Sequence, residues 1–275
     1  LFDTESINKS TSEYVLDLIK SNKEIKFIYL CGNHEKSSFL NYINEVPQNL
    51  LTFNDDWKYY NIDENVVVAG IDITKSNFKT LYSNLKLNKN NINIVVMHGQ
   101  ASKYFVEDNF EIVNLSMLKN KNINYLALGH IHSYFLDKLD DNSYYAYSGC
   151  LEGRGFDECG KKGFIELEVL NGQISSKFVP FAKREIVETD VDISNLYTIK
   201  EIDNKIAENV KGINPTSLIK VNLVGEIDED ANIDLPFLEN NLNEIFYFAK
   251  IENKTKLKID IEKYSNDVSI KGEFI

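Results

Sequence analysis

The sequence predicts an α/β fold: a sheet of buried strands, completed by an antiparallel sheet and followed by a small α+β domain. Three observations support this class. Short apolar runs rich in β-branched or aromatic residues recur up to His130. Closely spaced strand patterns replace them from about Tyr144, and the composition changes again after Phe181. We therefore expect two domains, over residues 1–181 and 182–275.

The first elements follow from the apolar pattern. A helix is expected from Ser10, with a Ser/Thr cap and an apolar stripe at Val15, Leu16 and Ile19. A buried strand is expected over Ile25–Leu30, ending in a Gly-Asn turn. Further buried strands are expected over Val66–Ile71, Ile92–Gly99 and Ile123–His130, the last two preceded by helices. Runs of this kind are typical of strands covered on both faces, with loops at their carboxyl ends.

The later elements are antiparallel strands and then a second domain. The runs YYAYSG, KGFIELEVL and QISSKFVPF are expected to form a sheet that packs on the first, and Asn171-Gly172 predicts a hairpin turn. Beyond Phe181, IKEIDNKIAENV and DLPFLENNLNEI predict helices, the second with Asp234 as cap and Pro236 in the first turn. SLIKVNLVGEI and KLKIDIEKY predict strands. The aromatic run IFYFAK is compatible with a stacking or partner surface, and also with an ordinary core strand.

Charge and composition exclude several classes of protein. The net charge is −12, from 30 basic and 42 acidic residues, so the chain lacks the basic face needed for broad adhesion to nucleic acid or anionic lipid. No apolar run approaches the roughly 20 residues that span a bilayer, and no secretion signal opens the chain. The 3 cysteines have no zinc-site spacing, which favours reduced thiols in a cytoplasmic protein without membrane contact.

All 4 histidines follow expected strands at the positions where those strands end: His34 in GNHE, His98 in MHG, and His130 and His132 in GHIH. Ligands of open α/β sheets bind just outside the carboxyl ends of strands, so separate strands can bring these side chains together. A lone histidine at such a position is more often structural. The combination, with no histidine left over, favours a metal site.

The spacing of His130 and His132 suggests how two ions could be held. Imidazole binds manganese, iron, zinc and similar ions, and an asparagine oxygen can add a hard ligand. In an extended segment residues i and i+2 face the same side, so His130 and His132 can face one site while reaching different ions. Two-metal hydrolases hold their ions about 3.5–4 Å apart.

The motifs GNHE, MHG and GHIH, in this order, resemble those of the calcineurin-like metallophosphoesterases. NYLALGHIHS and YSGCLEGRGFDECGKKGFIELEV are most similar to the bacterial DNA-repair exonuclease branch, the SbcD- and YhaO-like proteins. The resemblance covers Leu1 to Phe181, and KREIVETDVDIS is similar to the start of that branch's capping region.

This resemblance implies a four-layer αββα sandwich with a C-terminal capping domain and two divalent metal ions, most often Mn²⁺, with Fe, Zn or Mg as alternatives. Asn33, His98 and His130 would bind one ion, and His132 the other. A water shared by the ions would become the hydroxide that attacks phosphorus. His34 would be the catalytic residue beside the scissile phosphate, stabilising the transition state or protonating the leaving oxygen.

The implied function is metal-dependent phosphodiester hydrolysis, foremost as a DNA exonuclease in DNA repair. Its expected partners are DNA and an SMC-like ATPase, and a homodimer is compatible with the resemblance. Two alternatives stay open: a phosphoesterase for nucleotides or other small phosphoesters, and an inactive binding module with this fold. Arg154 in LEGRGFDE could contact phosphate or a nucleic-acid backbone, but a pairing with Asp157 or Glu158 explains it equally well.

The sequence departs from the family pattern at its start. That pattern opens with Asp-x-His and Gly-Asp-x-x-Asp, and only the final aspartate is matched, by Asp3. A strand–helix–strand unit of roughly 30 residues would precede Leu1. We therefore interpret the sequence as part of a longer enzyme; a segment supplied from elsewhere and an inactive polypeptide are the alternatives. As printed, the chain is expected to hold two metals poorly and to be impaired.

Overall fold

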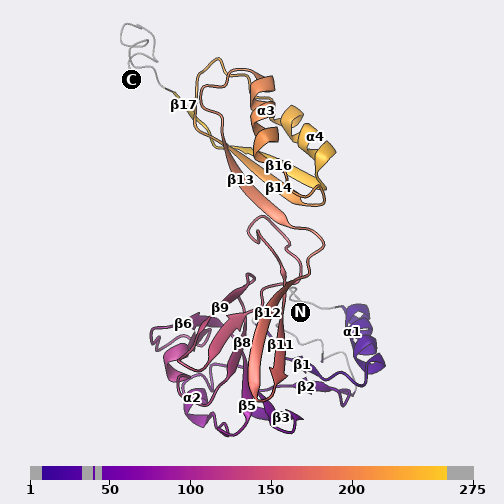
Figure 1. Cartoon of the computed structure of the whole chain (residues 1–275), viewed down its shortest axis with the longest axis vertical. Coiled ribbons are helices and arrows are strands. Elements are labelled where there is room, and N and C mark those ends of the chain that lie inside the picture. Colours follow the sequence, from indigo (N-terminus) through magenta and orange to yellow (C-terminus); the bar gives the residue numbers. More distant parts are fainter. Residues whose placement is uncertain (1–7, 33–39, 41–44, 259–275) are drawn as a thin grey trace. The chain divides into compact units, whose positions relative to one another are not determined.

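The computed structural model describes residues 8–32, 40 and 45–258, which form two compact units (Figure 1). Unit 1 comprises Leu1–Leu151 and Gly163–Pro180. Unit 2 comprises Glu152–Lys162 and Phe181–Ile275. The segment Glu152–Lys162 therefore folds with the C-terminal part of the chain, although both its neighbours in sequence belong to unit 1.

Unit 1 is built on a six-stranded mixed sheet. Its strands, in spatial order, are β3 (Lys58–Asp63), β4 (Val66–Gly70), β5 (Ile92–His98), β8 (Tyr125–Gly129), β10 (Tyr144–Tyr147) and β9 (Phe135–Lys138). The four central strands are parallel, and the edge strands β3 and β9 are antiparallel to their neighbours. Val95, Met97 and Leu126 are fully buried, which confirms that β5 and β8 are central strands.

The prediction that Tyr144–Tyr147 belongs to an antiparallel second sheet is wrong. This strand, β10, pairs parallel with β8, so that Tyr145 lies opposite Leu126. Three consecutive residues of β10, Tyr145, Ala146 and Tyr147, are buried. A strand that is covered on both faces fits the interior of a sheet. The sequence pattern of the strand does not show to which of the two expected sheets it belongs.

The predicted hairpin is confirmed. Strands β11 (Gly163–Leu170) and β12 (Gln173–Pro180) pair antiparallel along their whole length. Asn171 and Gly172, between them, have φ of 52° and 77°. Positive φ at both central residues is the geometry that favours Asn-Gly in two-residue hairpin loops.

The N-terminal helix α1 (Lys9–Ser21) carries the predicted apolar stripe, with Leu16 and Ile19 buried. Its cap is Asn8, whose side chain accepts from the N–H of Thr11 at 2.8 Å, so the predicted Ser/Thr cap is wrong. The strand that follows, β1 (Phe27–Tyr29), pairs parallel with β2 (Leu50–Thr52). Ile28 is 38% exposed, so β1 is not covered on both faces by the described residues.

The helices expected before β5 and β8 are single turns, α2 (Leu81–Asn84) and η2 (Leu115–Met117). A short parallel pair, β6 (Gln100–Ser102) and β7 (Ile112–Asn114), lies between β5 and η2 in the chain. Asparagine side chains hold the loops instead. The Asn77 amide, for example, donates to the carbonyls of Asp55 and Asp72, both at 2.8 Å. Such bonds compete with helix formation.

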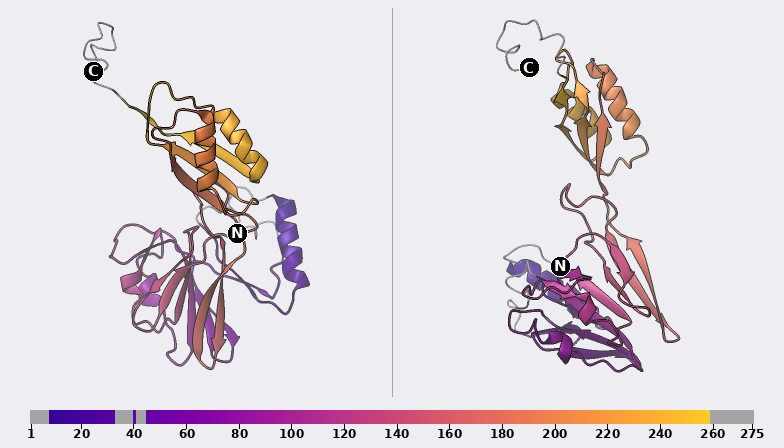
Figure 2. Two further views of the ribbon diagram at one scale, coloured as in Figure 1. Left: turned by 45° about the horizontal axis from the view of Figure 1, so that its top comes forward. Right: turned by 90° about the vertical axis from the view of Figure 1, so that its left-hand side faces the viewer.

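Unit 2 is a small α/β domain with a three-stranded sheet. In chain order its elements are β13 (Ile186–Asp192), α3 (Ile199–Asn209), β14 (Leu218–Val224), β15 (Glu226–Ile227), α4 (Leu235–Ile245), β16 (Phe248–Asn253) and β17 (Lys256–Leu257). The short strands β15 and β17 pair with each other, in parallel. The sheet strands are all parallel and both helices pack on one face (Figure 2), so the predicted α+β arrangement is wrong. The predicted cap of α4 is confirmed, since Asp234 accepts from the N–H of Phe237.

The aromatic run at the end of α4 is divided between core and surface. Phe246 and Ala249 are buried, but Tyr247 is 62% exposed. The guanidinium of Arg184 lies 3.7 Å from the centre of the Tyr247 ring. The run is therefore only partly the core strand that we considered.

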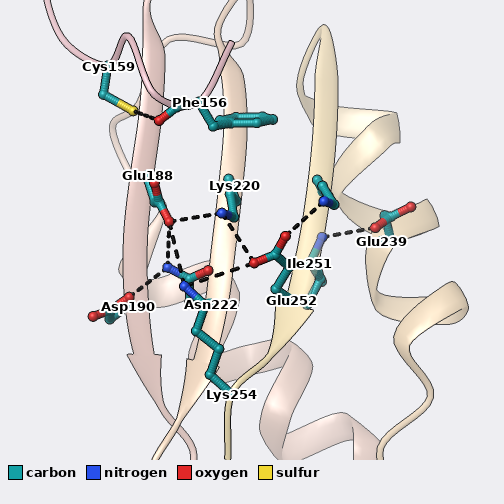
Figure 3. Close-up of polar contacts among 11 residues, drawn as sticks. Phe156, Cys159, Glu188, Asp190, Lys220, Asn222, Glu239, Ile251, Glu252 and Lys254 are labelled. Carbon is teal, nitrogen blue, oxygen red and sulfur yellow. Dashed lines mark hydrogen bonds and ion pairs between the residues drawn. The ribbon is translucent and has the colours of Figure 1, made fainter.

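The other face of the unit 2 sheet carries a network of charges (Figure 3). The ammonium group of Lys220 lies 3.1 Å from Glu188 and 3.2 Å from Glu252. Contacts with Lys250 and Lys220 lower the pKa of Glu252 to about 2. The buried Asn222 amide donates to Glu188 and Asp190, each at 2.8 Å. These opposite charges thus partly neutralise one another within the sheet.

No helix in the part of the chain that the structure describes is long and apolar enough to span a bilayer.

Candidate metal and phosphoester site

Two of the predicted ligands, His98 and His130, meet at the carboxyl edge of the unit 1 sheet. His98 is the last residue of β5 and pairs with Gly129, the last residue of β8. His130 follows directly. The two imidazole rings lie with their centroids 5.5 Å apart and almost perpendicular, at 89°. Two imidazoles at this separation can contribute to one metal site.

A pocket of about 220 Å³ opens at these histidines. Its lining includes Cys31, Gly32, Asp72, His98, Gly99 and His130. It therefore draws residues from the ends of β1, β4, β5 and β8, which is where open α/β sheets bind their ligands.

Two glycines, Gly32 and Gly129, lie against the His98 ring. A Cβ atom built on Gly129 would lie 2.7 Å from Nδ1 of His98, and one built on Gly32 would lie 3.1 Å from Cε1. Any side chain at Gly129 would displace the ring. The glycines of GNHE and GHIH thus leave room for the His98 ring in its observed orientation, in addition to allowing a turn.

The backbone of His130 is strained. Its φ is 117°, in a region that residues with a Cβ rarely adopt. Such strain costs on the order of 1–3 kcal/mol and is concentrated at functional sites. The premise that 130–132 is an extended segment is therefore wrong, because His130 lies in a bend.

His132 is separated from the pair by this bend. It is absent from the described residues that line the pocket. Its carbonyl oxygen faces Cys150, whose N–H lies 3.4 Å away. The proposed role of His132 at a second ion stays a prediction.

Asn33 and His34 lie outside the described residues. Within those residues, no group of three or more His, Cys, Asp or Glu side chains could hold a metal ion. The described donors nevertheless fit part of a metal site, because two imidazoles share a pocket with the Asp72 carboxylate, whose Oδ1 has no hydrogen-bond partner among the described residues.

Asp72 is a site residue that the sequence analysis missed. Burial raises the pKa of its carboxyl group, while the backbone N–H of Cys31 and the charge of Lys58 oppose that change. The only sequence signal is its place just beyond an apolar strand, the same signal that identified the histidines.

Tyr147 is a second residue that the sequence analysis missed. Its buried hydroxyl donates to the carbonyl of Gly99 at 2.8 Å and accepts from the N–H of Ala101 at 2.6 Å. It thereby fixes the turn that follows His98. Burial raises the pKa of Tyr147 to about 12.

We expect the stability of unit 1 to fall as the pH rises from 10 to 12. The protonated phenol is favoured in the folded state, so its contribution is complete below the ordinary pKa of 10.0 and is lost as the pH passes the folded value of about 12. The full loss is at most about 3 kcal/mol. Denaturant unfolding followed by the fluorescence of Trp57, the single tryptophan, measures it.

Tyr147→Phe is the matched variant. Near pH 8 it should be less stable by about 1–2 kcal/mol, since two buried hydrogen bonds are lost. Because phenylalanine does not titrate, this difference should shrink between pH 10 and 12. Burial also raises the pKa of Tyr125, and that contribution is common to both proteins. If the free energy of unfolding falls equally with pH in both proteins, the loss of stability above pH 10 does not come from Tyr147.

Arg154, the predicted substrate contact, lies in the segment that folds with unit 2. Its guanidinium lies 3.1 Å from Oε1 of Glu158, whose other oxygen accepts from the Arg154 N–H at 3.0 Å. The Glu158 side chain is only 8% exposed. The structure thus shows the pairing that we considered as the alternative, and a phosphate contact stays a prediction.

The comparisons with known proteins match the part of the chain that holds the histidine pair. Residues 1–134, which include every histidine, match the calcineurin-like phosphoesterases. This part of the chain is thus similar to the calcineurin-like phosphoesterases, a family of hydrolases whose members typically bind two metal ions.

The chain is also similar to the DNA double-strand break repair protein Mre11 of Saccharolobus solfataricus. The two are 25% identical over 182 residues, which cover 60% of this chain and 47% of that protein. The chain thus spans about half the length of this relative.

Proposed function

We propose that this protein is a metal-dependent phosphodiesterase that degrades DNA as an exonuclease in DNA repair. The observation that carries the proposal is the convergence of His98 and His130 at one sheet edge of a phosphoesterase domain. The similarity to a DNA double-strand break repair protein supports DNA as the substrate.

We further propose that unit 1 is the sheet-bearing part of a four-layer αββα sandwich and that unit 2 is a capping domain. The six-stranded mixed sheet and the β11–β12 hairpin, which returns to unit 1, support the first statement. The separate core of unit 2 supports the second.

In the proposed site, Asn33, His98 and His130 hold one divalent ion and His132 contributes to another, with Mn²⁺ as the expected metal. Bound divalent ions polarise the phosphate and supply a nucleophile near neutral pH. Gly32 and Gly129 leave room for the His98 imidazole in the orientation that it has in the pocket.

We assign proton transfer to His34. Its ordinary pKa of about 6.5 suits a group that gives a proton to the leaving oxygen near neutral pH. We also propose a cytoplasmic location and an SMC-like ATPase partner. The net charge of −12 fits a nuclease that leaves part of its DNA binding to that partner.

His34→Ala tests the assignment. We expect the rate of Mn²⁺-dependent degradation of linear DNA by the full-length protein to fall about 10²–10⁴-fold, since general acid catalysis contributes that much. Mn²⁺ affinity should stay unchanged, because His34 is not a proposed ligand. Cleavage assays and calorimetric titration with Mn²⁺ give the two quantities.

The same assays separate the alternatives. Turnover of p-nitrophenyl phosphoesters without any DNA cleavage, even with the ATPase present, would favour a small-phosphoester hydrolase. Absence of both activities would favour a binding module. Undiminished cleavage by His34→Ala would remove its catalytic assignment.

A further inference from the structure

Asp72 and His98 lie at the same edge of the unit 1 sheet. Strands β4 and β5 are parallel, and Gly70 pairs with Val96. Asp72 follows Gly70 by two residues, and His98 follows Val96 by two residues. Both line the pocket that also contains His130. Three neighbouring strand ends therefore bring one carboxylate and two imidazoles to a common space.

The Asp72 carboxylate is only partly satisfied by the protein. It accepts from the backbone N–H of Cys31. Its Oδ1 atom is buried and has no hydrogen-bond partner among the described residues. Lys58 attracts the carboxylate, but the Lys58 amine donates to the carbonyl of Thr52 at 3.2 Å.

A carboxylate oxygen that is buried without a hydrogen bond destabilises a protein unless a nearby positive charge compensates it. A divalent ion held by His98 and His130 would provide that charge. Within the described residues, Asp72 and these histidines do not form a three-ligand cluster. The carboxylate is thus placed to act on the ion from outside its ligand shell, as the carboxylates beside metal-binding histidines do.

We propose that Asp72 is a positioning residue of the metal site, whose negative charge raises the affinity of the His98–His130 site for a divalent cation. The inference rests on the proposed metal-dependent function. It adds to that function a residue that is itself not a ligand.

Asp72→Asn tests the charge with little change in shape. Asparagine keeps an oxygen that can accept from Cys31, so the backbone contact is retained while the charge is lost. The matched control is Asp56→Asn, the same change at an exposed aspartate of unit 1. Titration of each full-length protein with Mn²⁺, followed by the electron paramagnetic resonance of free Mn²⁺, gives the dissociation constants.

We expect the dissociation constant to rise roughly 10–100-fold for Asp72→Asn, as for other residues that support metal ligands. Asp56→Asn should bind as the wild type does. Excess Mn²⁺ should restore DNA cleavage by Asp72→Asn, which a merely structural defect would not allow. Asp72→Ser, which also removes the charge, should show the same weakening if Asp72→Asn folds poorly.

If Asp72→Asn and Asp72→Ser bind Mn²⁺ as tightly as the wild type does, the proposed role of Asp72 is overturned and the proposed function is left intact. Absence of Mn²⁺ binding in the wild type would overturn both. If Asp56→Asn loses as much Mn²⁺ affinity as Asp72→Asn does, the net charge of the protein alone is responsible. That result would also overturn the role of Asp72.

Discussion

His98→Ala should abolish the phosphodiesterase activity that we propose for this protein, because it removes a proposed metal ligand. The His98 ring lies 5.5 Å from the His130 ring in a common pocket, so either imidazole alone leaves the ion under-coordinated. The ion supplies several kcal/mol of transition-state stabilisation. Its loss should lower kcat/KM about a thousandfold or more. Metal content per chain and Mn²⁺-dependent DNA cleavage are the measurements.

Gln100→Ala is the matched control for this prediction. Gln100 is exposed and lies two residues beyond His98, in β6. Its truncation should leave metal content and cleavage at the wild-type level. Unfolding followed through Trp57 should show His98→Ala folded, since His98 is only partly buried. A folded His98→Ala protein that binds Mn²⁺ normally would exclude His98 from the ligand set.

The sequence predicted those parts of the fold that local chemistry determines. The Asn171-Gly172 turn and the Asp234 cap depend on a few neighbouring residues, and both are confirmed. The placement of Tyr144–Tyr147 depends on a partner strand that is distant in the chain, and there the prediction was wrong. The segment Glu152–Lys162 folds with unit 2 through contacts such as the bridge between Gly160 and Ile186, which no local pattern indicates.

The site shows the same division. Histidines are rare in this chain, so His98 and His130 were found from residue type and position, and the structure brings them together. Asp72 was missed because aspartate is common and usually exposed, and only the tertiary structure shows that its Oδ1 is buried. The φ of 117° at His130 is likewise a property of the folded chain.

Gly129→Ala should weaken metal binding because it displaces the side chain of His98, a proposed ligand, although residue 129 is not itself a ligand. The added Cβ would lie 2.7 Å from Nδ1 of His98, closer than nonbonded atoms approach. Because a ring moves more easily than a strand, we expect the His98 side chain to rotate away. Mn²⁺ affinity should then fall roughly 10–100-fold, as it does when residues that position a metal ligand are mutated. Calorimetric titration measures this, and Trp57 fluorescence should show unit 1 still folded.

A double-mutant cycle on the free energy of unfolding tests whether Gly129→Ala acts through a clash with the His98 ring. In the His98→Ala background the space beside residue 129 is free, so adding Gly129→Ala should change the free energy of unfolding by less than about 0.5 kcal/mol. In the wild-type background the same substitution should destabilise unit 1 by roughly 1–3 kcal/mol, the usual range for overpacking. An equal destabilisation in both backgrounds would mean that Gly129 is needed for the β8 backbone. A destabilisation confined to proteins that contain the imidazole would show that Gly129 is needed to leave room for the His98 ring.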